Sequence, residues 1–185
     1  MKGRWGETRT KCLPRSLAPQ PIQTFLEKQT VRTKQNGFSL IELLIVVAII
    51  LIIAAIAIPN LLRAKIAANE ASAVGSLRTL NTACIAYSTS YGQFPAALSN
   101  LAPVASGGTA SSTSADLIDS VLAAGTKSGY AFLYTAGSSN QSYTITAKPI
   151  VAGQTGQRMF FTDQSGVIRA DSSGSGASAS STPIG

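Results

Sequence analysis

Residues 36–60, NGFSLIELLIVVAIILIIAAIAIPN, decide the fold of this chain. From Phe38 to Ile58 there are 21 residues, and only Ser39 and Glu42 among them are polar. A helix of that length is about 31 Å long, which is close to the thickness of the hydrocarbon core of a bilayer. The stretch therefore predicts a membrane-spanning helix that carries a carboxylate near its start.

The charge of the chain is concentrated before this stretch. The 185 residues carry 15 Lys/Arg, 8 Asp/Glu and no His, a net charge of +7. Residues 1–37 hold eight of the Lys/Arg and two of the Asp/Glu, so the rest of the chain carries only +1. We expect residues 1–37 to be a basic cytoplasmic leader, which by the positive-inside rule keeps the N-terminus in the cytoplasm and exports the rest. Because the excess charge belongs to the leader, nucleic-acid binding is not indicated.

The helix is predicted to continue beyond Pro59, which we expect to kink it; the alternative is that this proline ends it. Residues 59–91 keep good helix formers and an apolar stripe at steps of three and four. The stripe consists of Ile66, Val74, Leu77, Leu80, Cys84, Tyr87 and Tyr91, and the polar residues Arg63, Asn69, Arg78, Asn81 and Thr82 mostly fall outside it. We predict one helix of about 50 residues, membrane-spanning over 38–58, amphipathic over 59–91 and ended by YGQFP.

Residues 92–171 are predicted to form a globular head. The Ser/Gly/Thr-rich stretch 106–115 is expected to be a solvated loop, and 115–125 a short helix with Ser114 as N-cap and Gly125 at its end. Strand formers cluster at 129–137, 141–149, 157–163 and 166–170. We predict three or four antiparallel strands, and their apolar face needs the amphipathic helix as cover.

Two short segments complete this prediction. The tetrapeptide DQSG, which starts at Asp163, suits a type I turn with Gly166 at positive φ. The tail, residues 172–185, is rich in Ser and Gly and is predicted to be disordered. The fold class that follows is α+β, with one long helix packed on an antiparallel sheet.

The sequence offers little for catalysis or metal binding. Cys12 and Cys84 are far apart and there is no His, so a structural zinc site, which takes about four N/S ligands, is excluded. Asp163 and Asp171 are isolated carboxylates, whereas a calcium site needs about six to eight oxygen ligands. No motif orients a nucleophile, so we expect no enzyme activity, no metal and no cofactor. The aromatic residues are interpreted as core packing.

The opening stretch resembles the N-terminus of type IV pilins and of the pseudopilins of type II secretion. The resemblance is carried by Gly37, by Phe38 directly after it, by Glu42 four residues further on, and by a long apolar helix with Pro59 near its end. The close match covers Gly37 to about Asn60, and the order of helix and then sheet extends it over most of the chain. It implies a pilin-like fold.

The resemblance also implies a processing path. The family's membrane-embedded aspartic prepilin peptidase would cut between Gly37 and Phe38 and would N-methylate the new terminus at Phe38. The leader 1–37 would be removed, and the mature subunit 38–185 would wait in the lipid of the inner membrane. An inner-membrane assembly platform would then move it into a homopolymer held together by the N-terminal helices. In the family, the glutamate equivalent to Glu42 pairs with the terminal amine of a neighbouring subunit, which would set the axial register.

The function implied is that of a structural subunit of a type IV pilus at the cell surface, serving twitching motility, adhesion or DNA uptake. The alternative is a pseudopilin of a type II secretion system; the Ser/Gly/Thr-rich loops favour the surface pilus. A signal peptide, suggested by the pattern Ala55-Ile56-Ala57, and a plain membrane anchor are further interpretations, but neither explains Glu42. The leader is long for this family, so a true start at Val31 is a further hypothesis.

Overall fold

The computed structural model describes residues 37–173 and 176–184. The chain divides into two units, Met1–Ser39 and Leu40–Gly185. Of the first unit only residues 37–39 are described, and they form no regular structure. The predicted leader before Gly37 therefore lies outside the described residues.

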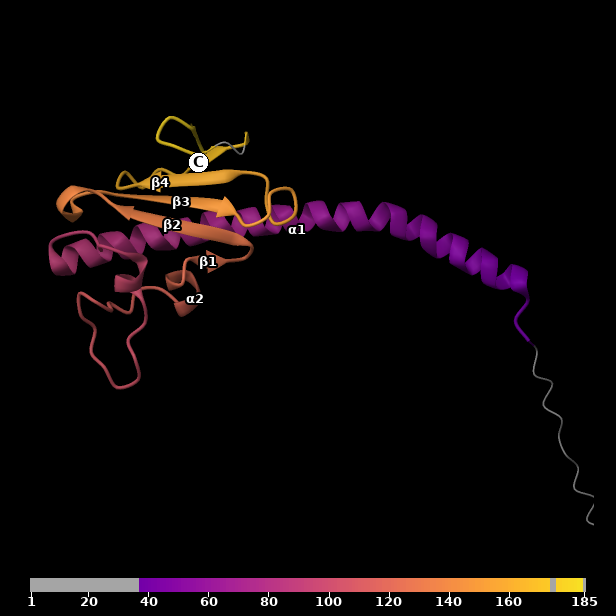
Figure 1. Cartoon of the computed structure of the whole chain (residues 1–185), viewed down its shortest axis with the longest axis horizontal. Helices are drawn as coiled ribbons and strands as arrows, with labels where there is room; N and C mark the ends of the chain where they lie inside the picture. The colour runs from indigo at the N-terminus through magenta and orange to yellow at the C-terminus, as the bar shows by residue number, and fades with distance from the viewer. Residues whose placement is uncertain (1–36, 174–175, 185) are drawn as a thin grey trace, which may run out of the picture. The chain divides into compact units, whose positions relative to one another are not determined.

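The long helix α1 runs without interruption from Leu40 to Tyr91, with Pro59 inside it (Figure 1). Its 52 residues confirm the prediction of one continuous helix, and the alternative that Pro59 ends the helix is wrong. A kink at Pro59 stays a prediction. The helix ends where Gly92 takes a φ of 74° and donates its N–H to the Ser88 carbonyl at 2.8 Å, an arrangement that satisfies one of the last carbonyls of a helix.

One antiparallel sheet follows, with its strands in chain order. The strands are β1 (Thr126–Lys127), β2 (Tyr130–Ala136), β3 (Tyr143–Pro149), β4 (Met159–Asp163), β5 (Arg169–Asp171) and β6 (Thr182–Pro183). The expected number of three or four strands is therefore wrong, because the sheet has six. The four predicted strands correspond to β2 to β5, whereas β1 and β6 have two residues each and are too short to show an alternating pattern.

The turn between β4 and β5 lies at the predicted position, with the predicted positive φ at Gly166. The N–H of Gly166 donates to the carbonyl of Asp163 at 2.9 Å, and Gly166 has a φ of 74°. The Asp163 carboxylate accepts the N–H of Ser165 at 2.9 Å. This carboxylate is therefore part of the turn, as expected for an Asp at the first turn position.

The short helices between α1 and the sheet differ from the prediction. A 3-10 helix, η1, covers Leu98–Leu101, and α2 covers only Ser120–Ala123 instead of 115–125. The N-cap of α2 is Asp119, whose Oδ1 accepts the Leu122 N–H at 2.9 Å. Ser114, the predicted cap, instead donates its hydroxyl to the carbonyls of Ala102 and Pro103. Gly125, at a φ of 78°, follows the end of α2 as predicted.

The hydrophobic core lies between the C-terminal half of α1 and one face of the sheet (Figure 1). The helix contributes its predicted stripe, of which Leu77, Leu80, Cys84 and Tyr87 are at most 3% exposed. On the sheet side the largest buried side chains are Tyr130, Tyr143, Ile145 and Phe160. Burying one large apolar side chain contributes about 1.5–3 kcal/mol, so this interface holds the head on the helix.

The face of α1 that packs on the sheet also includes a polar residue, Asn81. The sequence pattern groups Asn81 with the polar residues that mostly fall outside the stripe, yet Asn81 is only 6% exposed. Its Nδ2 donates to Thr162 Oγ1 at 2.9 Å, and its Oδ1 accepts the Tyr143 hydroxyl at 3.2 Å. A buried amide is tolerated because its hydrogen bonds are satisfied inside the protein. The helix thus meets the sheet through a polar contact as well as through apolar packing.

The end of the chain is more ordered than predicted. In the tail 172–185, β6 pairs with β5 through Arg169 with Pro183 and Ala170 with Thr182. Ala177 is 9% exposed and belongs to the buried residues. The prediction of a disordered tail is therefore wrong for this part, because the free edge of β5 offers backbone hydrogen-bond partners to the chain that follows.

Candidate processing and assembly site

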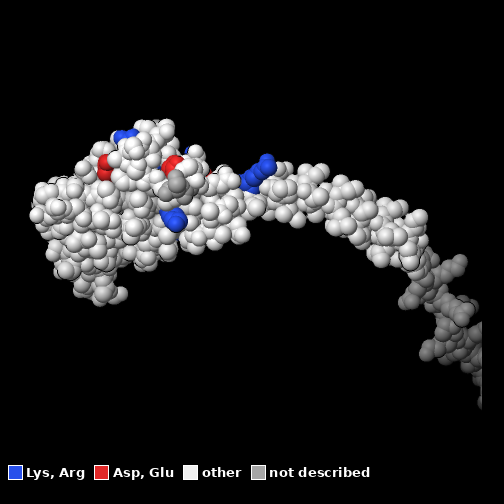
Figure 2. All heavy atoms as spheres, turned by 45° about the horizontal axis from the view of Figure 1, so that its top comes forward, with Lys and Arg blue, Asp and Glu red and all other residues white. Residues whose placement is uncertain are grey.

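The N-terminal half of α1 is covered by nothing in the described chain. All 17 large apolar side chains from Phe38 to Leu62 are exposed, and the first buried residue of α1 is Glu70. By length and composition, α1 is the one helix of the described part that is able to cross a membrane. Figure 2 shows this half of the helix as a stretch without charged atoms on the visible face. A folded protein does not leave so large an apolar surface in water, so lipid or protein must cover it.

The junction between Gly37 and Phe38 is open. Both residues are exposed, and Phe38 keeps 78% of its surface accessible. A Cβ added to Gly37 would meet no atom within 4 Å, and Gly37 does not have a positive φ that would favour glycine. The described chain therefore gives no reason of its own for glycine at this position.

Glu42 lies in the first turn of α1 and is exposed. The first backbone N–H groups of a helix form its positive end, so a carboxylate here is favoured. The side chains around it on the helix are apolar, and within the described residues Glu42 forms no ion pair. Its charge is therefore free to meet a cation from outside the described chain.

The four residues singled out from the sequence lie in two places. Gly37 and Phe38 belong to the segment before α1, and Glu42 and Pro59 belong to α1 itself. Glu42 and Pro59 are 17 positions apart on the helix, which corresponds to about 25 Å along its axis. The proline is therefore not part of a common site with the glutamate.

The sequence analysis missed Glu70, which fastens α1 to the loop before β4. Its Oε1 accepts the N–H groups of Gln157 and Arg158 at 2.9 and 3.1 Å, and its Oε2 accepts Arg158 Nε at 2.8 Å. Asn69 adds a hydrogen bond from Nδ2 to the Thr155 carbonyl at 2.9 Å. Together these contacts tie the start of the covered half of α1 to the end of the sheet nearest the exposed half.

The electrostatics of Glu70 follow from these contacts. Burial opposes ionisation and by itself raises the pKa of the carboxyl, but hydrogen bonds from Gln157 and Arg158 and the charge of Arg158 outweigh it, so the pKa lies below its ordinary value. Periodicity was the one signal that could have found this residue. Glu70 stands four positions from both Ile66 and Val74, on the apolar stripe itself.

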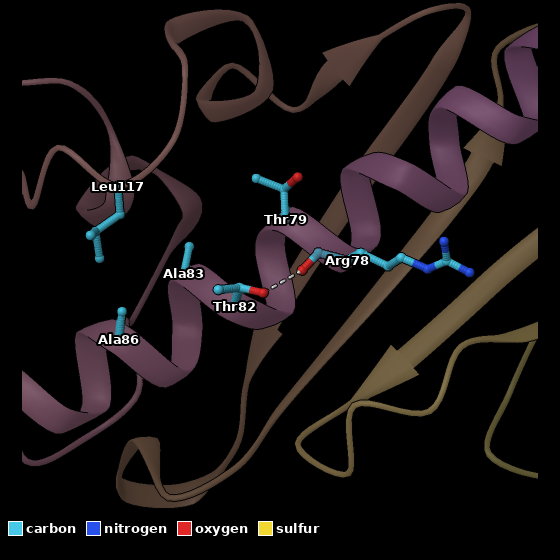
Figure 3. A pocket seen from close by; sticks show the side chains of 6 residues that line it. All are labelled: Arg78, Thr79, Thr82, Ala83, Ala86 and Leu117. Atoms are coloured by element: carbon cyan, nitrogen blue, oxygen red, sulfur yellow. Dashed lines mark hydrogen bonds between the residues drawn. The ribbon is translucent and has the colours of Figure 1, made fainter. Parts of the chain in front are cut away.

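A shallow groove lies beside α1 on the head. It has a volume of about 380 Å³ and is lined by Arg78, Thr79, Thr82, Ala83, Ala86 and Leu117. Figure 3 shows Ala83 and Ala86 facing Leu117, whereas Arg78 extends away from the groove. Thr82 donates its hydroxyl to the Arg78 carbonyl at 3.0 Å. These lining residues hold no pair of nucleophile and base, so the groove offers surface but no chemistry.

A family model described as the prokaryotic N-terminal methylation motif matches residues 32–58. A search of curated proteins and a search of solved structures found no match to the chain. The matched residues include Gly37, Phe38 and Glu42 and most of the exposed apolar half of α1, which continues into a helix-on-sheet head of pilin-like architecture. The motif implies processing by a prepilin peptidase, and the exposed helix fits anchoring in the inner membrane before assembly. The match over residues 32–58 therefore supports a prepilin of the type IV pilin-like or pseudopilin-like kind.

Proposed function

We propose that this protein is a structural subunit of a type IV pilus at the cell surface. It is assembled from an inner-membrane pool after residues 1–37 are removed and Phe38 is methylated. The single observation that carries the proposal is the division of α1. Its first half exposes 16 large apolar side chains, whereas its second half is packed under the head. A helix of this kind can be covered first by lipid and later by the same helices of neighbouring subunits.

Cleavage between Gly37 and Phe38 accounts for the glycine. Since a side chain at residue 37 would meet nothing within 4 Å in the described part of the chain, the reason for glycine lies outside the described fold. A peptidase that draws the extended chain into a narrow site provides such a reason, because glycine lets the backbone approach closely. Cleavage would also remove most of the excess positive charge, since residues 1–37 carry +6 of the +7.

Glu42 then has a role in setting the register of subunits. An acidic side chain at the centre of a bilayer costs about 2.5–3.5 kcal/mol on insertion scales, although Glu42 lies near the helix end, where the cost is lower. Cleavage creates an ammonium group at Phe38, and this group on a neighbouring subunit is the partner that Glu42 lacks within the described chain. A pairing of this type fixes position more than it adds stability.

The exposed loop of the head favours a surface filament. Residues 106–113 are all exposed and consist of Ser, Gly, Thr and Ala. A polar loop of this composition suits a filament surface in contact with water. A pseudopilus inside the periplasm is the alternative that the experiment must separate from a surface pilus.

The test is deletion of the gene, followed by electron microscopy of the cell surface and by measurement of exported proteins in the medium. We expect surface filaments to disappear, to return when the full-length chain is supplied again, and protein export to continue. Normal filaments together with failed export would contradict the proposal and would indicate a secretion pseudopilin. In that case the exposed helix would still serve assembly, but in a different machine.

A further inference from the structure

Two charged residues of α1, Glu42 and Arg63, flank an uncharged stretch that is about as long as a membrane is thick. Between Glu42 and Arg63 the helix holds 20 residues, 43–62, without a charged side chain. Twenty helical residues extend about 30 Å, the thickness of the hydrocarbon core. If Glu42 lies at one interface, Arg63 and Lys65 lie at the opposite one, and no charge needs to enter the hydrocarbon. Figure 2 shows basic atoms on the helix between this uncharged stretch and the head.

Arg63 and Lys65 are two cations without a partner in the described part of the chain. Both are exposed, and neither takes part in an ion pair there. The nearest acid on the same face, Glu70, is held by Arg158 at 2.8 Å and by two backbone N–H groups. The next basic residue along α1 is Arg78, 13 positions beyond Lys65.

A small recess adjoins Arg63 where the head begins. It has a volume of about 220 Å³, and its lining consists of Arg63, Ile66, Ala67, Glu70 and Gln157. Glu70 is one of the lining residues, but its negative charge is balanced by Arg158. The charge that remains uncompensated is that of Arg63, so the recess suits an anionic group rather than a cation.

These cations do not serve as the orientation signal. Basic residues next to a span favour the cytoplasmic side, and Arg63 and Lys65 stand on the side of the exported head. The leader, with eight Lys/Arg, supplies the orientation signal instead. After the leader is removed, Arg63 and Lys65 are the basic residues closest to the span, and they are on the side where this rule disfavours them.

We propose that Arg63 and Lys65 bind the phosphate groups of anionic phospholipids in the leaflet that faces the head, and that they set the depth of α1 in the membrane. The inference rests on the membrane-held stage of the proposed function. Long basic side chains place their charges at the headgroup level while their stems follow apolar surface. The guanidinium of Arg63 can hold a phosphate through two parallel hydrogen bonds. Residues two positions apart do not face the same side of a helix, so the two cations hold two separate lipids.

The test uses the full-length chain in phosphatidylcholine vesicles that contain a minority of phosphatidylglycerol. Leu62→Trp in a Trp5→Phe background places one energy donor beside the two cations. Energy transfer to pyrene-labelled phosphatidylglycerol is compared with transfer to pyrene-labelled phosphatidylcholine. Flotation of the vesicles shows separately whether the chain has inserted. The test variant carries Arg63→Gln with Lys65→Gln, and the matched control carries Arg78→Gln with Lys148→Gln, which removes two exposed charges from the head.

We expect phosphatidylglycerol near the donor to be enriched about fivefold per cation over its share in the vesicle. Added salt should weaken this enrichment. The test variant should lose the enrichment, and quenching of the donor by brominated acyl chains should rise because the helix sinks deeper. The control should behave as the unmodified chain. Insertion with equal transfer to both lipids, or an equal loss in the control, would overturn the inference and leave the proposed function intact. Failure of the unmodified chain to float with vesicles would overturn both.

Discussion

Glu70→Gln removes the charge that fastens α1 to the loop before β4 while keeping the shape of the side chain. The carboxylate accepts three hydrogen bonds, two from backbone N–H groups and one from Arg158 Nε, all between 2.8 and 3.1 Å. A hydrogen bond to a charged group contributes about 1.5–3 kcal/mol. The amide oxygen can still accept the two backbone N–H groups, but the amide nitrogen then faces the guanidinium as a second donor. The Arg158 side chain is 44% exposed, so water compensates part of the loss. We expect the free energy of unfolding to fall by about 2 kcal/mol at pH 7.

This difference should depend on pH in a defined direction. The pKa of the Glu70 carboxyl lies below its ordinary value of 4.5 in the folded protein. A group of this kind contributes stability that is fully present above its unfolded pKa and is lost as the pH falls through its folded pKa. The unmodified chain should therefore be more stable than the variant at pH 7. The advantage should shrink below about pH 4.5 and disappear once the carboxyl is protonated in both states.

The measurement is urea unfolding of the full-length chain in detergent micelles, followed by the near-ultraviolet circular dichroism of the buried tyrosines. Asp116→Asn is the matched control, because it also changes an acid to its amide, at an exposed position with no ion pair in the described chain. It should change the stability by less than about 0.5 kcal/mol. Equal stability of Glu70→Gln and the unmodified chain at pH 7, or a difference that stays constant down to low pH, would refute the role given to this carboxylate.

Three further predictions concern single positions. Replacing Gly37 with Trp should abolish leader removal, and intact-mass measurement would show the uncleaved chain; a normally trimmed product would exclude cleavage after residue 37. Glu42→Ala should leave the head folded but reduce filament yield by roughly tenfold or more, because a loss of only about 1.4 kcal/mol from the free energy of assembly lowers the equilibrium constant tenfold. Filaments at unmodified levels by electron microscopy would argue against the register role. Burial raises the pKa of the Cys84 thiol to about 12, so in a Cys12→Ser background maleimide at pH 8 should modify Cys84 only after unfolding. Rapid labelling of the native chain would show that this part of the core opens.

The parts of the fold that follow from short-range patterns were predictable from the sequence. The continuous helix through Pro59, the stripe from Leu77 to Tyr87 and the turn at Asp163 depend on residues within a few positions of one another. The buried polar contacts were not predictable in this way. Asn81 meets Thr162 across 81 positions, and Glu70 meets Arg158 across 88. A helical pattern identifies the face of the helix that a residue occupies, but not the distant residue that it contacts.

Composition gave a wrong prediction for the tail, because the structure of the tail depends on the edge of the sheet beside it. The tail is rich in Ser and Gly, and such sequences are disordered when nothing nearby can bind their backbone. Here the free edge of β5 pairs with β6, and Ile184 donates its N–H to the Ile168 carbonyl at 2.9 Å. For the candidate site, the sequence identified the residues, but their roles have not been tested. Gly37, Phe38 and Glu42 lie within the matched motif and are exposed, while cleavage, methylation and register stay predictions.

The energetics of α1 explain why one carboxylate can matter among so many apolar residues. Covering 16 large side chains, each worth about 1.5–3 kcal/mol, is worth tens of kcal/mol, several times the stability of a typical domain. The apolar half of the helix must therefore be covered at every stage of the proposed path. Lipid tails and neighbouring helices are about equally apolar, so this large term nearly cancels when a subunit moves from membrane to filament. Small terms then decide the equilibrium. They are the close packing between helices and, on the proposed path, the ion pair that Glu42 would form with the amine of another subunit.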